Sequence, residues 1–391
     1  MKLDNQRFTV VNFYPLEFMG GGEFVAINLF NNLAKKYDIT YISPINLRTM
    51  ERVKEDEIRK MISFRYIRTY FHKNFLSIFS RPYPDKNDLK NTKLLLYFLD
   101  RPPSRSFIKI VKSLDLTTVF LLHGITREEI CFRNLPISFY TRIVSHLLRR
   151  QLALIKNKNC YLQTLNASFD GFLSELDFSR CKIFRIGNGI DFTEYKILNN
   201  DKFVIIWIGR MEKNTKGADL LLSIIYEVNK LFGLFLKNES PEFTIIGSGN
   251  YSEYFSKRSK KYINVKYHGY VSDEEKKRLL ASSNMMLLTS RIEPYPIAAI
   301  EGIASGLYIL STITSGPSEI VNKDPLFGET VKFQPRKFAR RIYELFLKWQ
   351  KDKEHFYIDK ITRRQYGSII FSQNKMAEMY DEMIQSIINF T

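Results

Sequence analysis

The sequence contains few cysteines, and none of them has a neighbour at the spacing of a metal site. Among 391 residues there are only three, Cys131, Cys160 and Cys181, and no Cys-x-x-Cys pair. This usage argues against a structural zinc site and against a disulfide framework, and it is typical of proteins in a reducing compartment. We therefore expect a cytoplasmic protein.

Long hydrophobic runs are also absent. The best run, Leu94 to Leu99, is bracketed by Lys93 and Asp100 and is a third of the ~18 apolar residues that a membrane span needs. The chain opens with Met-Lys-Leu-Asp and passes directly into a strand pattern, so we expect no signal peptide. The composition predicts a chain that does not cross a membrane.

The charge is strongly positive and unevenly distributed. The net charge is +18, and residues 1–190 carry 30 basic and 17 acidic side chains. Such a basic half can face nucleic acid, anionic lipid or a phosphorylated acceptor, or can simply be a solvated surface. No zinc finger, RNP motif or helix-turn-helix pattern is present, which disfavours nucleic acid.

Two basic segments of the first half predict a possible peripheral contact with an anionic membrane. Tyr140 to Lys158 reads as a basic amphipathic helix, and Ile58 to Lys73 is both basic and aromatic. Faces of this kind can lie on anionic lipid. An ordinary helix that covers a sheet explains the first segment equally well, so both interpretations stay open.

The first part of the chain follows the order strand, helix, strand. Phe8 to Tyr14 is a β-rich run that ends at Pro15 and leads into a loop with Gly20-Gly21-Gly22-Glu23. Apolar residues then recur every three or four positions from Phe24 to Ala34, which predicts a helix. Ile39 to Ser43 predicts the next strand. This βαβ order predicts a parallel sheet with helices on its faces.

The same order recurs along the rest of the chain. Further strands are predicted at Val119–Leu122, Cys160–Thr164, Ile183–Ile186, Phe203–Ile208, Phe243–Ile246, Met285–Leu288 and Tyr308–Ser311. Helices are predicted at Asp219–Phe232, Ser272–Ser282 and Ile297–Ser305. The pattern predicts an α/β chain of two doubly wound, Rossmann-like domains facing across a cleft. In such folds ligands bind beyond the carboxyl ends of the strands.

The strongest motif follows the strand predicted at Phe203–Ile208. It reads Gly209-Arg210 and, six residues later, Lys216-Gly217 just before a helix. A guanidinium, an ammonium and a helix N-terminus would then be directed at one place, which suits a diphosphate. The alternative is that Arg210 and Lys216 are surface charges that flank a loop.

A second motif places two glutamates, Glu293 and Glu301, on either side of a predicted helix start. Glu293 follows a strand and Glu301 lies one or two turns into the next helix. Both can therefore point into the same crevice. Two glutamates at this spacing mean little alone, but their strand-end and helix-start context makes a binding role the better interpretation.

Together these motifs resemble the GT-B-fold retaining glycosyltransferases of the family 4 type, the glycosyl transferases group 1. The resemblance is nearly continuous from Gly187 to Glu319, with islands at Gly20–Glu23, His123-Gly124, Asn188–Asp191 and the segment that begins at Phe371. It implies an acceptor-binding domain at 1–187, a nucleotide-sugar domain at 188–365, and a C-terminal helix at 366–391 that packs back on the first domain.

The resemblance also implies roles for the residues of the second half. Arg210 and Lys216 would hold the donor diphosphate, Glu293 the donor sugar and Glu301 the ribose. Val271 would line the base pocket. Because Pro294 and Pro296 lack an N–H, the backbone of Tyr295 and Ile297 would contact phosphate.

In the first half, the resemblance implies two further site residues. Gly21 would let backbone N–H groups approach the phosphates, and His123 would lie near the transferring sugar. A single histidine at a strand end is more often structural, but its position in the family favours the site. The stripe Met376, Met379, Tyr380, Met383 and Ile387 is interpreted as core packing.

The implied activity is a retaining, metal-independent transfer of a hexose-type sugar from a UDP- or GDP-linked donor. The acceptor would be a glycan, a lipid-linked or a protein-linked hydroxyl, and no cofactor is expected. The sequence has no Asp-x-Asp pair, so the cationic side chains would take the place of a metal beside the leaving diphosphate. A nucleotide-sugar epimerase on the same fold and a non-catalytic sugar-nucleotide-binding protein remain alternatives.

Overall fold

A computed structural model describes residues 7–12, 16, 21–45, 54–70, 86–98, 105–123, 160–169, 182–235 and 239–389. The chain divides into two compact units, which are considered separately. One unit comprises residues 1–189 and 373–391, and the other residues 190–372. The basic segment from Tyr140 to Lys158 lies outside the described residues.

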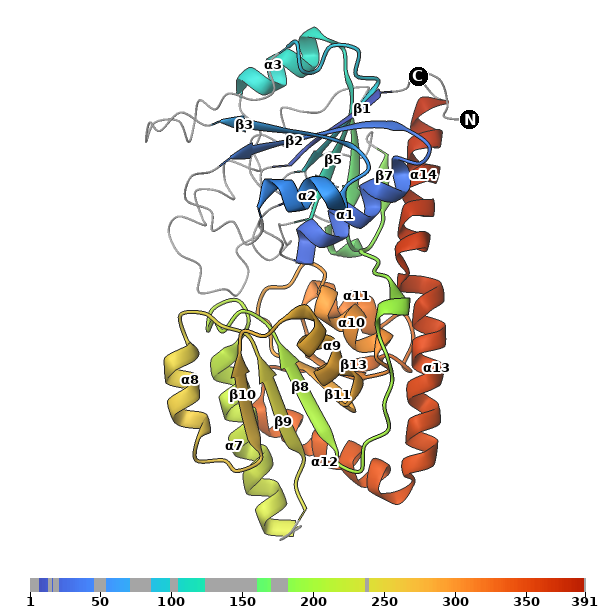
Figure 1. Cartoon of the computed structure of the whole chain (residues 1–391). Helices are drawn as coiled ribbons and strands as arrows, with labels where there is room; N and C mark the ends of the chain where they lie inside the picture. Colours follow the sequence, from blue (N-terminus) through green and yellow to red (C-terminus); the bar gives the residue numbers. More distant parts are fainter. Residues whose placement is uncertain are drawn as a thin grey trace. The chain divides into compact units, whose positions relative to one another are not determined.

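The first unit is built on a parallel seven-stranded sheet with the order β3-β2-β1-β4-β5-β6-β7 (Figure 1). Its strands are β1 (Arg7–Val11), β2 (Asp38–Ile45), β3 (Arg65–Tyr70), β4 (Leu94–Phe98), β5 (Thr117–Leu122), β6 (Cys160–Thr164) and β7 (Ile183–Arg185). Its helices are α1 (Gly21–Leu33), α2 (Glu55–Met61), α3 (Arg105–Ser113) and α14 (Gln373–Ile388). The residues of β4 and β5 are buried without alternation, as expected of strands covered on both faces.

Two expectations for this unit are changed by the structure. Gly21 to Glu23 were predicted as loop but form the first turn of α1. Within the basic segment from Ile58 to Lys73, the residues Arg65–Tyr70 form β3, which pairs with β2 and is thus a strand of the sheet. The amphipathic pattern of aromatic and basic residues there follows from the alternation of a strand.

The last helix packs on the first unit through its apolar stripe. Met376, Tyr380, Met383 and Ile387 are buried, whereas Met379 is not. On the rim of this contact Asp381 of α14 pairs with the Lys36 ammonium at 2.6 Å. The prediction that this stripe is core packing is confirmed.

The second unit contains a parallel six-stranded sheet with the order β10-β9-β8-β11-β12-β13. Its strands are β8 (Val204–Ile208), β9 (Glu242–Ile246), β10 (Val265–Gly269), β11 (Met285–Leu288), β12 (Tyr308–Thr312) and β13 (Gly328–Val331). Its helices are α7 (Ala218–Phe235), α8 (Ser252–Ser259), α9 (Asp273–Ala281), α10 (Ile297–Ala304), α11 (Ser315–Val321), α12 (Pro335–Lys351) and α13 (Lys353–Phe371). The predicted strands of this half are confirmed.

The core of the second unit lies between its sheet and the pair α7 and α12. Trp207, Ile224 and Phe338 are members of one buried cluster that joins the sheet to these two helices. Pro335 occupies the start of α12, where its missing N–H costs no hydrogen bond. This packing fixes α7, and with it the loop that precedes α7.

In the described part of the chain, no helix is both long enough and apolar enough to cross a lipid bilayer.

Candidate functional site

The strand order of the second unit identifies the carboxyl-terminal edge of its sheet as the candidate site. From β8 the chain proceeds through β9 and β10 in one direction, and β11, β12 and β13 then lie on the other side of β8. At such a switch point the loops after the two central strands diverge and leave a crevice at their carboxyl ends. The segments Gly209–Gly217 and Thr289–Pro296 follow β8 and β11 at this place.

Lys216 and Glu293 meet at this edge. The Lys216 ammonium forms an ion pair with the Glu293 carboxylate, and the Ser290 hydroxyl donates to the same carboxylate at 3.1 Å. The Lys216 side chain is 23% exposed and that of Glu293 only 10%. A partly buried ammonium with three donors can hold this carboxylate and still present an N–H to an anion.

Two successive hydrogen bonds from the core fix the backbone before α7. Trp207 Nε1 donates to the Thr289 hydroxyl at 3.0 Å, and this hydroxyl donates to the Lys216 carbonyl at 2.7 Å. Gly217 lies so close to the end of β11 that an added Cβ would be 2.1 Å from the Thr289 carbonyl oxygen, and its φ is +65°. Only glycine fits this position.

Arg291 clamps the same loop from the other side, and the sequence analysis did not identify it. Its guanidinium donates twice to the Asp219 carboxylate, at 2.7 and 2.8 Å, and also to the Lys213 carbonyl. Burial raises the pKa of Asp219, but Arg291 outweighs burial and holds that pKa below its ordinary value. Only one residue separates Arg291 from Glu293. This closeness to the two-glutamate motif was the one sequence feature that could have indicated a role for Arg291.

Arg210 lies at the carboxyl end of β8 but does not join Lys216 and Glu293. Its side chain is 67% exposed, and its guanidinium is 3.3 Å from the Glu212 carboxylate. Because a surface pair of this kind is weak, the guanidinium can turn toward an anion at the edge. Lys216 and Glu293 are thus in direct contact, as predicted. Arg210 lies at the same edge of the sheet but pairs with Glu212 instead.

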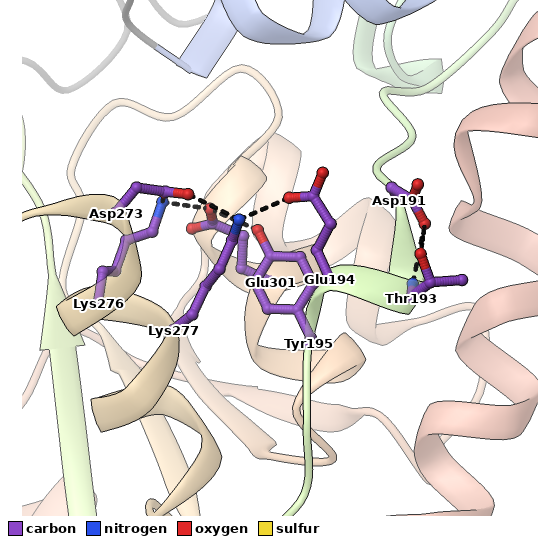
Figure 2. A network of polar contacts seen from close by, with 8 residues as sticks. All are labelled: Asp191, Thr193, Glu194, Tyr195, Asp273, Lys276, Lys277 and Glu301. Carbon is purple, nitrogen blue, oxygen red and sulfur yellow. Dashed lines mark hydrogen bonds and ion pairs between the residues drawn. The ribbon is translucent and has the colours of Figure 1, made fainter.

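Glu301 belongs to a second polar network of the same unit (Figure 2). One of its carboxylate oxygens accepts from the Lys276 ammonium at 2.7 Å and from the Tyr195 hydroxyl at 3.0 Å. Figure 2 also shows Asp273, which pairs with Lys276 at 2.8 Å and with Lys277 at 2.7 Å. The Glu301 side chain is 9% exposed, so its charge is balanced inside the protein.

The network leaves the second oxygen of Glu301 without a hydrogen bond to any described residue. Burial lowers the pKa of Lys276, but Glu301 and Asp273 more than compensate and raise it. Burial and the Glu301 charge both raise the pKa of Tyr195. Lys276 therefore stays a cation and Tyr195 a hydrogen-bond donor, and together they orient the Glu301 carboxylate as an acceptor for hydroxyl groups.

Lys276 and Tyr195 were also missed by the sequence analysis. Lys276 sits on α9, whose start has a recognisable signature. The Ser272 hydroxyl accepts from the backbone N–H of Glu275 at 3.2 Å, as in a capping box. That signature locates the helix but does not indicate that its first turn reaches Glu301.

The remaining predicted residues of this unit line the same edge. Val271 is half-buried between β10 and α9, Tyr295 is buried, and Ile297 begins α10 after Pro296. Within the described ranges, the backbone N–H groups of Tyr295 and Ile297 have no acceptor. The start of a helix favours anions because its N–H groups are unsatisfied.

Gly21 and His123 belong to the other unit. Gly21 is the first residue of α1, which follows β1, and β1 and β4 form the switch point of that sheet. His123 directly follows β5. The placement of these two residues relative to Lys216 and Glu293 stays a prediction.

The hydrogen bonds around His123 fix the position of its proton. Its Nε2 lies 2.7 Å from the Gln163 side-chain oxygen and 3.1 Å from the Tyr380 hydroxyl. The Gln163 amide nitrogen donates to the carbonyls of Thr164 and Ile186, so its oxygen must face the ring. His123 Nε2 is therefore the donor, and Nδ1 carries the lone pair.

We expect His123 to be neutral and Nε2-protonated at pH 7. Burial lowers its pKa to about 4, although the bond to Gln163 acts in the opposite direction. The ordinary pKa is about 6.5, so the stability that His123 contributes is complete above pH 6.5. It is lost as the pH falls through the window from about 6.5 to about 4. Nitrogen-15 NMR of the imidazole, assigned with a His123→Gln variant, measures the tautomer and the pKa of His123. A titration midpoint above pH 6 would contradict the prediction of a neutral, Nε2-protonated ring.

No group of three or more histidine, cysteine, aspartate or glutamate side chains that could hold a metal ion occurs within the described ranges.

Solved structures share this architecture over nearly the whole chain. A glycosyltransferase from Rickettsia africae superposes with a TM-score of 0.74 at 17% identity and covers 99% of this chain and 100% of its own. Anabaena Alr3699/HepE, solved with UDP and glucose, gives a TM-score of 0.70 at 13% identity and covers 97% of this chain and 100% of its own. At such identities the likeness shows the fold, which is GT-B.

A family model matches part of the second half of the chain. Residues 192–361 match the family described as glycosyl transferases group 1. A protein of Klebsiella pneumoniae, described as an uncharacterized 41.2 kDa protein in the cps region, is 26% identical over 192 residues. The aligned part spans 48% of this chain and 48% of that relative, about half the length of each. The part of the chain that matches this family contains Lys216, Glu293 and Glu301, and the chain as a whole has the GT-B fold.

Proposed function

We propose that this chain transfers a hexose-type sugar from a nucleoside diphosphate donor to a hydroxyl acceptor, with retention at the anomeric carbon and without a metal. The observation that carries the proposal is the Lys216–Glu293 ion pair at the switch point of β8 and β11. It combines one acidic group for sugar hydroxyls with one cation for phosphate. Both lie next to the start of α10, in the domain that matches the family.

Each part of the donor has a group of matching chemistry along this edge. The diphosphate would contact the Lys216 ammonium, the exposed Arg210 guanidinium and the backbone N–H groups of Tyr295 and Ile297. The free oxygen of Glu301 would accept from the ribose hydroxyls, and Val271 would lie against the base. HepE, of similar fold, was solved with UDP, which supports UDP as the nucleotide.

The proposed reaction needs no covalent intermediate with the protein. The bond between the anomeric carbon and the diphosphate oxygen breaks, and an acceptor oxygen bonds to that carbon on the same face. The acceptor proton passes to the departing diphosphate. Lys216 and Arg210 stabilise the negative charge on the leaving group. Because Glu293 is held by Lys216 and Ser290, it acts as an acceptor for sugar hydroxyls and not as a nucleophile.

Calorimetry with UDP and GDP tests the donor site. We expect the chain to bind a nucleoside diphosphate with an affinity that EDTA does not change, because cationic side chains and N–H groups replace the metal. Binding that disappears with EDTA and returns with Mg²⁺ would contradict the metal-free part of the proposal. Absence of binding to both nucleotides would contradict the donor site itself.

Two alternatives are separated from the transferase by their products. An epimerase on this fold would convert a UDP-sugar donor with no acceptor present. A non-catalytic protein would bind the donor but would not release UDP, whichever acceptor is added. A transferase releases UDP in proportion to acceptor, so the dependence of UDP release on acceptor decides among the three.

A further inference from the structure

A basic and apolar surface lies along helices α7 and α8 of the second unit. Helix α8 and the residues after it line an open hollow of about 380 Å³ with Tyr254, Lys257, Arg258 and Lys261. These residues recur at intervals of three or four, so they share one side of the helix. We call this surface the α8 face.

The cations of the α8 face have no acidic partner. None of Lys257, Arg258 and Lys261 forms a salt bridge with any residue that the structure describes. Instead, the Arg258 guanidinium lies 5.3 Å from the centre of the Tyr254 ring, and the Lys261 ammonium lies 4.9 Å from that of Tyr262. The one acidic residue of α8 is Glu253. The face therefore keeps a net positive charge that the protein does not neutralise.

Helix α7 extends the α8 face with residues of the same kinds. The two helices contact each other and run side by side (Figure 1), and Lys261 lies 5.9 Å from the ring centre of Tyr226 on α7. Tyr226, Lys230 and Leu234 follow at four-residue intervals, which places them along one stripe. All three are exposed, Leu234 to 67%.

Large apolar side chains on this surface are left in water. Ile263 is fully exposed, at 101%, and the Tyr254 and Tyr226 rings are each about half exposed, at 48% and 49%. A single exposed apolar residue needs no explanation. Here exposed aliphatic, tyrosine and cationic side chains occur on α7, on α8 and on the loop that leads from α8 to β10, a composition typical of surfaces that lie on a bilayer.

We propose that the α8 face, extended by Tyr226, Lys230, Leu234 and Ile263, docks on an anionic membrane surface. The unpaired cations would attract the headgroups, while the tyrosine rings, Leu234 and Ile263 would enter the interface. A soluble polyanion fits less well because it offers nothing to Leu234 and Ile263. Ile263 precedes β10, so it lies at the opposite end of the sheet from Lys216 and Glu293. Leu234, at the end of α7, and Ile263 would thus enter the interface at the end of the unit that is remote from the donor edge.

Flotation of the full chain with vesicles tests this proposal. We expect binding to phosphatidylcholine vesicles with about 30% phosphatidylglycerol and none to phosphatidylcholine alone, with loss in 0.5 M NaCl. Each cation near such a surface contributes about fivefold to partitioning. The triple variant Lys257→Glu, Arg258→Glu, Lys261→Glu is therefore expected to bind at least about 100-fold more weakly.

Two further variants decide what kind of surface this is. The control Lys90→Glu, Lys109→Glu, Lys112→Glu changes the same number of exposed basic side chains on the other unit, and we expect it to bind within about threefold of the parent. The double variant Ile263→Ser, Leu234→Ser keeps every charge, and we expect about tenfold weaker binding. All variants should show the parent's circular dichroism and melting temperature, since the altered residues are exposed.

The outcomes separate the possibilities. Equal losses in the two charge-reversal triples would overturn the proposal, because net charge and not this face would then drive binding. Unchanged vesicle binding by the α8-face triple would do the same. If the Ile263 and Leu234 variant binds vesicles like the parent, the surface is a polyanion site and the membrane proposal fails. None of these results depends on transfer activity.

Discussion

Replacing Lys216 by alanine is expected to lower the kcat/KM for sugar transfer by about 100- to 1,000-fold. The ammonium would neutralise charge that develops on the departing diphosphate. Removing one fixed donor of this kind lowers the rate of a reaction by about that factor. Affinity for the nucleoside diphosphate product is expected to fall by tenfold or more, because a charge-assisted contact is lost. Calorimetry and initial rates with a UDP-sugar donor measure both quantities.

The matched control is Lys213→Ala, which removes an exposed lysine of the same loop. Among the described residues, Lys213 makes its hydrogen bonds through its backbone carbonyl, which accepts from Arg291 and from the Gly217 N–H. We therefore expect a kcat/KM within about twofold of the parent. A Lys216→Ala enzyme that keeps parental kinetics and affinity would remove Lys216 from the donor site.

A double variant separates chemistry from stability. Without Lys216, the Glu293 carboxylate stays in a site where it is 10% exposed, and an unpaired charge there destabilises the fold. In Lys216→Met, Glu293→Gln the charge is gone, so the melting temperature should return toward that of the parent. The transfer rate should stay low, because the phosphate contact is still missing. Recovery of both would show that Lys216 acts only on stability.

Gly217→Ala is expected to destabilise the second unit by more than about 3 kcal/mol. The left-handed backbone, with φ of +65°, costs a residue with a Cβ about 1–2 kcal/mol. In addition, the new Cβ would lie 2.1 Å from the Thr289 carbonyl oxygen. That carbonyl cannot easily move, since its residue is tied to both Trp207 and the Lys216 carbonyl.

For a unit of this size the change corresponds to a fall in melting temperature on the order of 6–12 °C. Donor affinity should fall as well, because the loop that carries Lys216 must shift. Thermal unfolding with and without UDP measures both effects. A Gly217→Ala variant that melts with the parent would mean that the loop is not pressed against β11.

Two other glycines serve as controls for this prediction. Gly269 has a similar φ of +67° with open space around its Cβ position, so its alanine variant should lose only the 1–2 kcal/mol of backbone strain. Gly233 lies in α7 with nothing near the Cβ position. There alanine should stabilise by about 0.5–1 kcal/mol. The ranking of the three variants distinguishes steric clash from strain.

Local patterns in the sequence were sufficient for most of the second unit. The strand at Met285–Leu288 was predicted with the bounds that the structure gives it, and the Asp219–Phe232 prediction falls inside α7. Short buried strands and amphipathic helices have periods that can be read directly from apolar residues. The strand Val265–Gly269 was missed: Lys266 and His268 alternate with its apolar residues at the edge of the sheet, and the strands that were predicted in this unit are continuous or nearly continuous apolar runs.

The sequence by itself determined the parallel α/β architecture and the acidic and basic residues that end up at one sheet edge, because strand order and strand-end motifs are local features. Only the tertiary structure decided the partners of those residues. Tyr380 reaches His123 from 257 positions away, Lys276 reaches Glu301, and Arg291 reaches Asp219 across 72 positions. Such pairs are set by which loops the packed sheet brings together, and no periodicity along the chain records that.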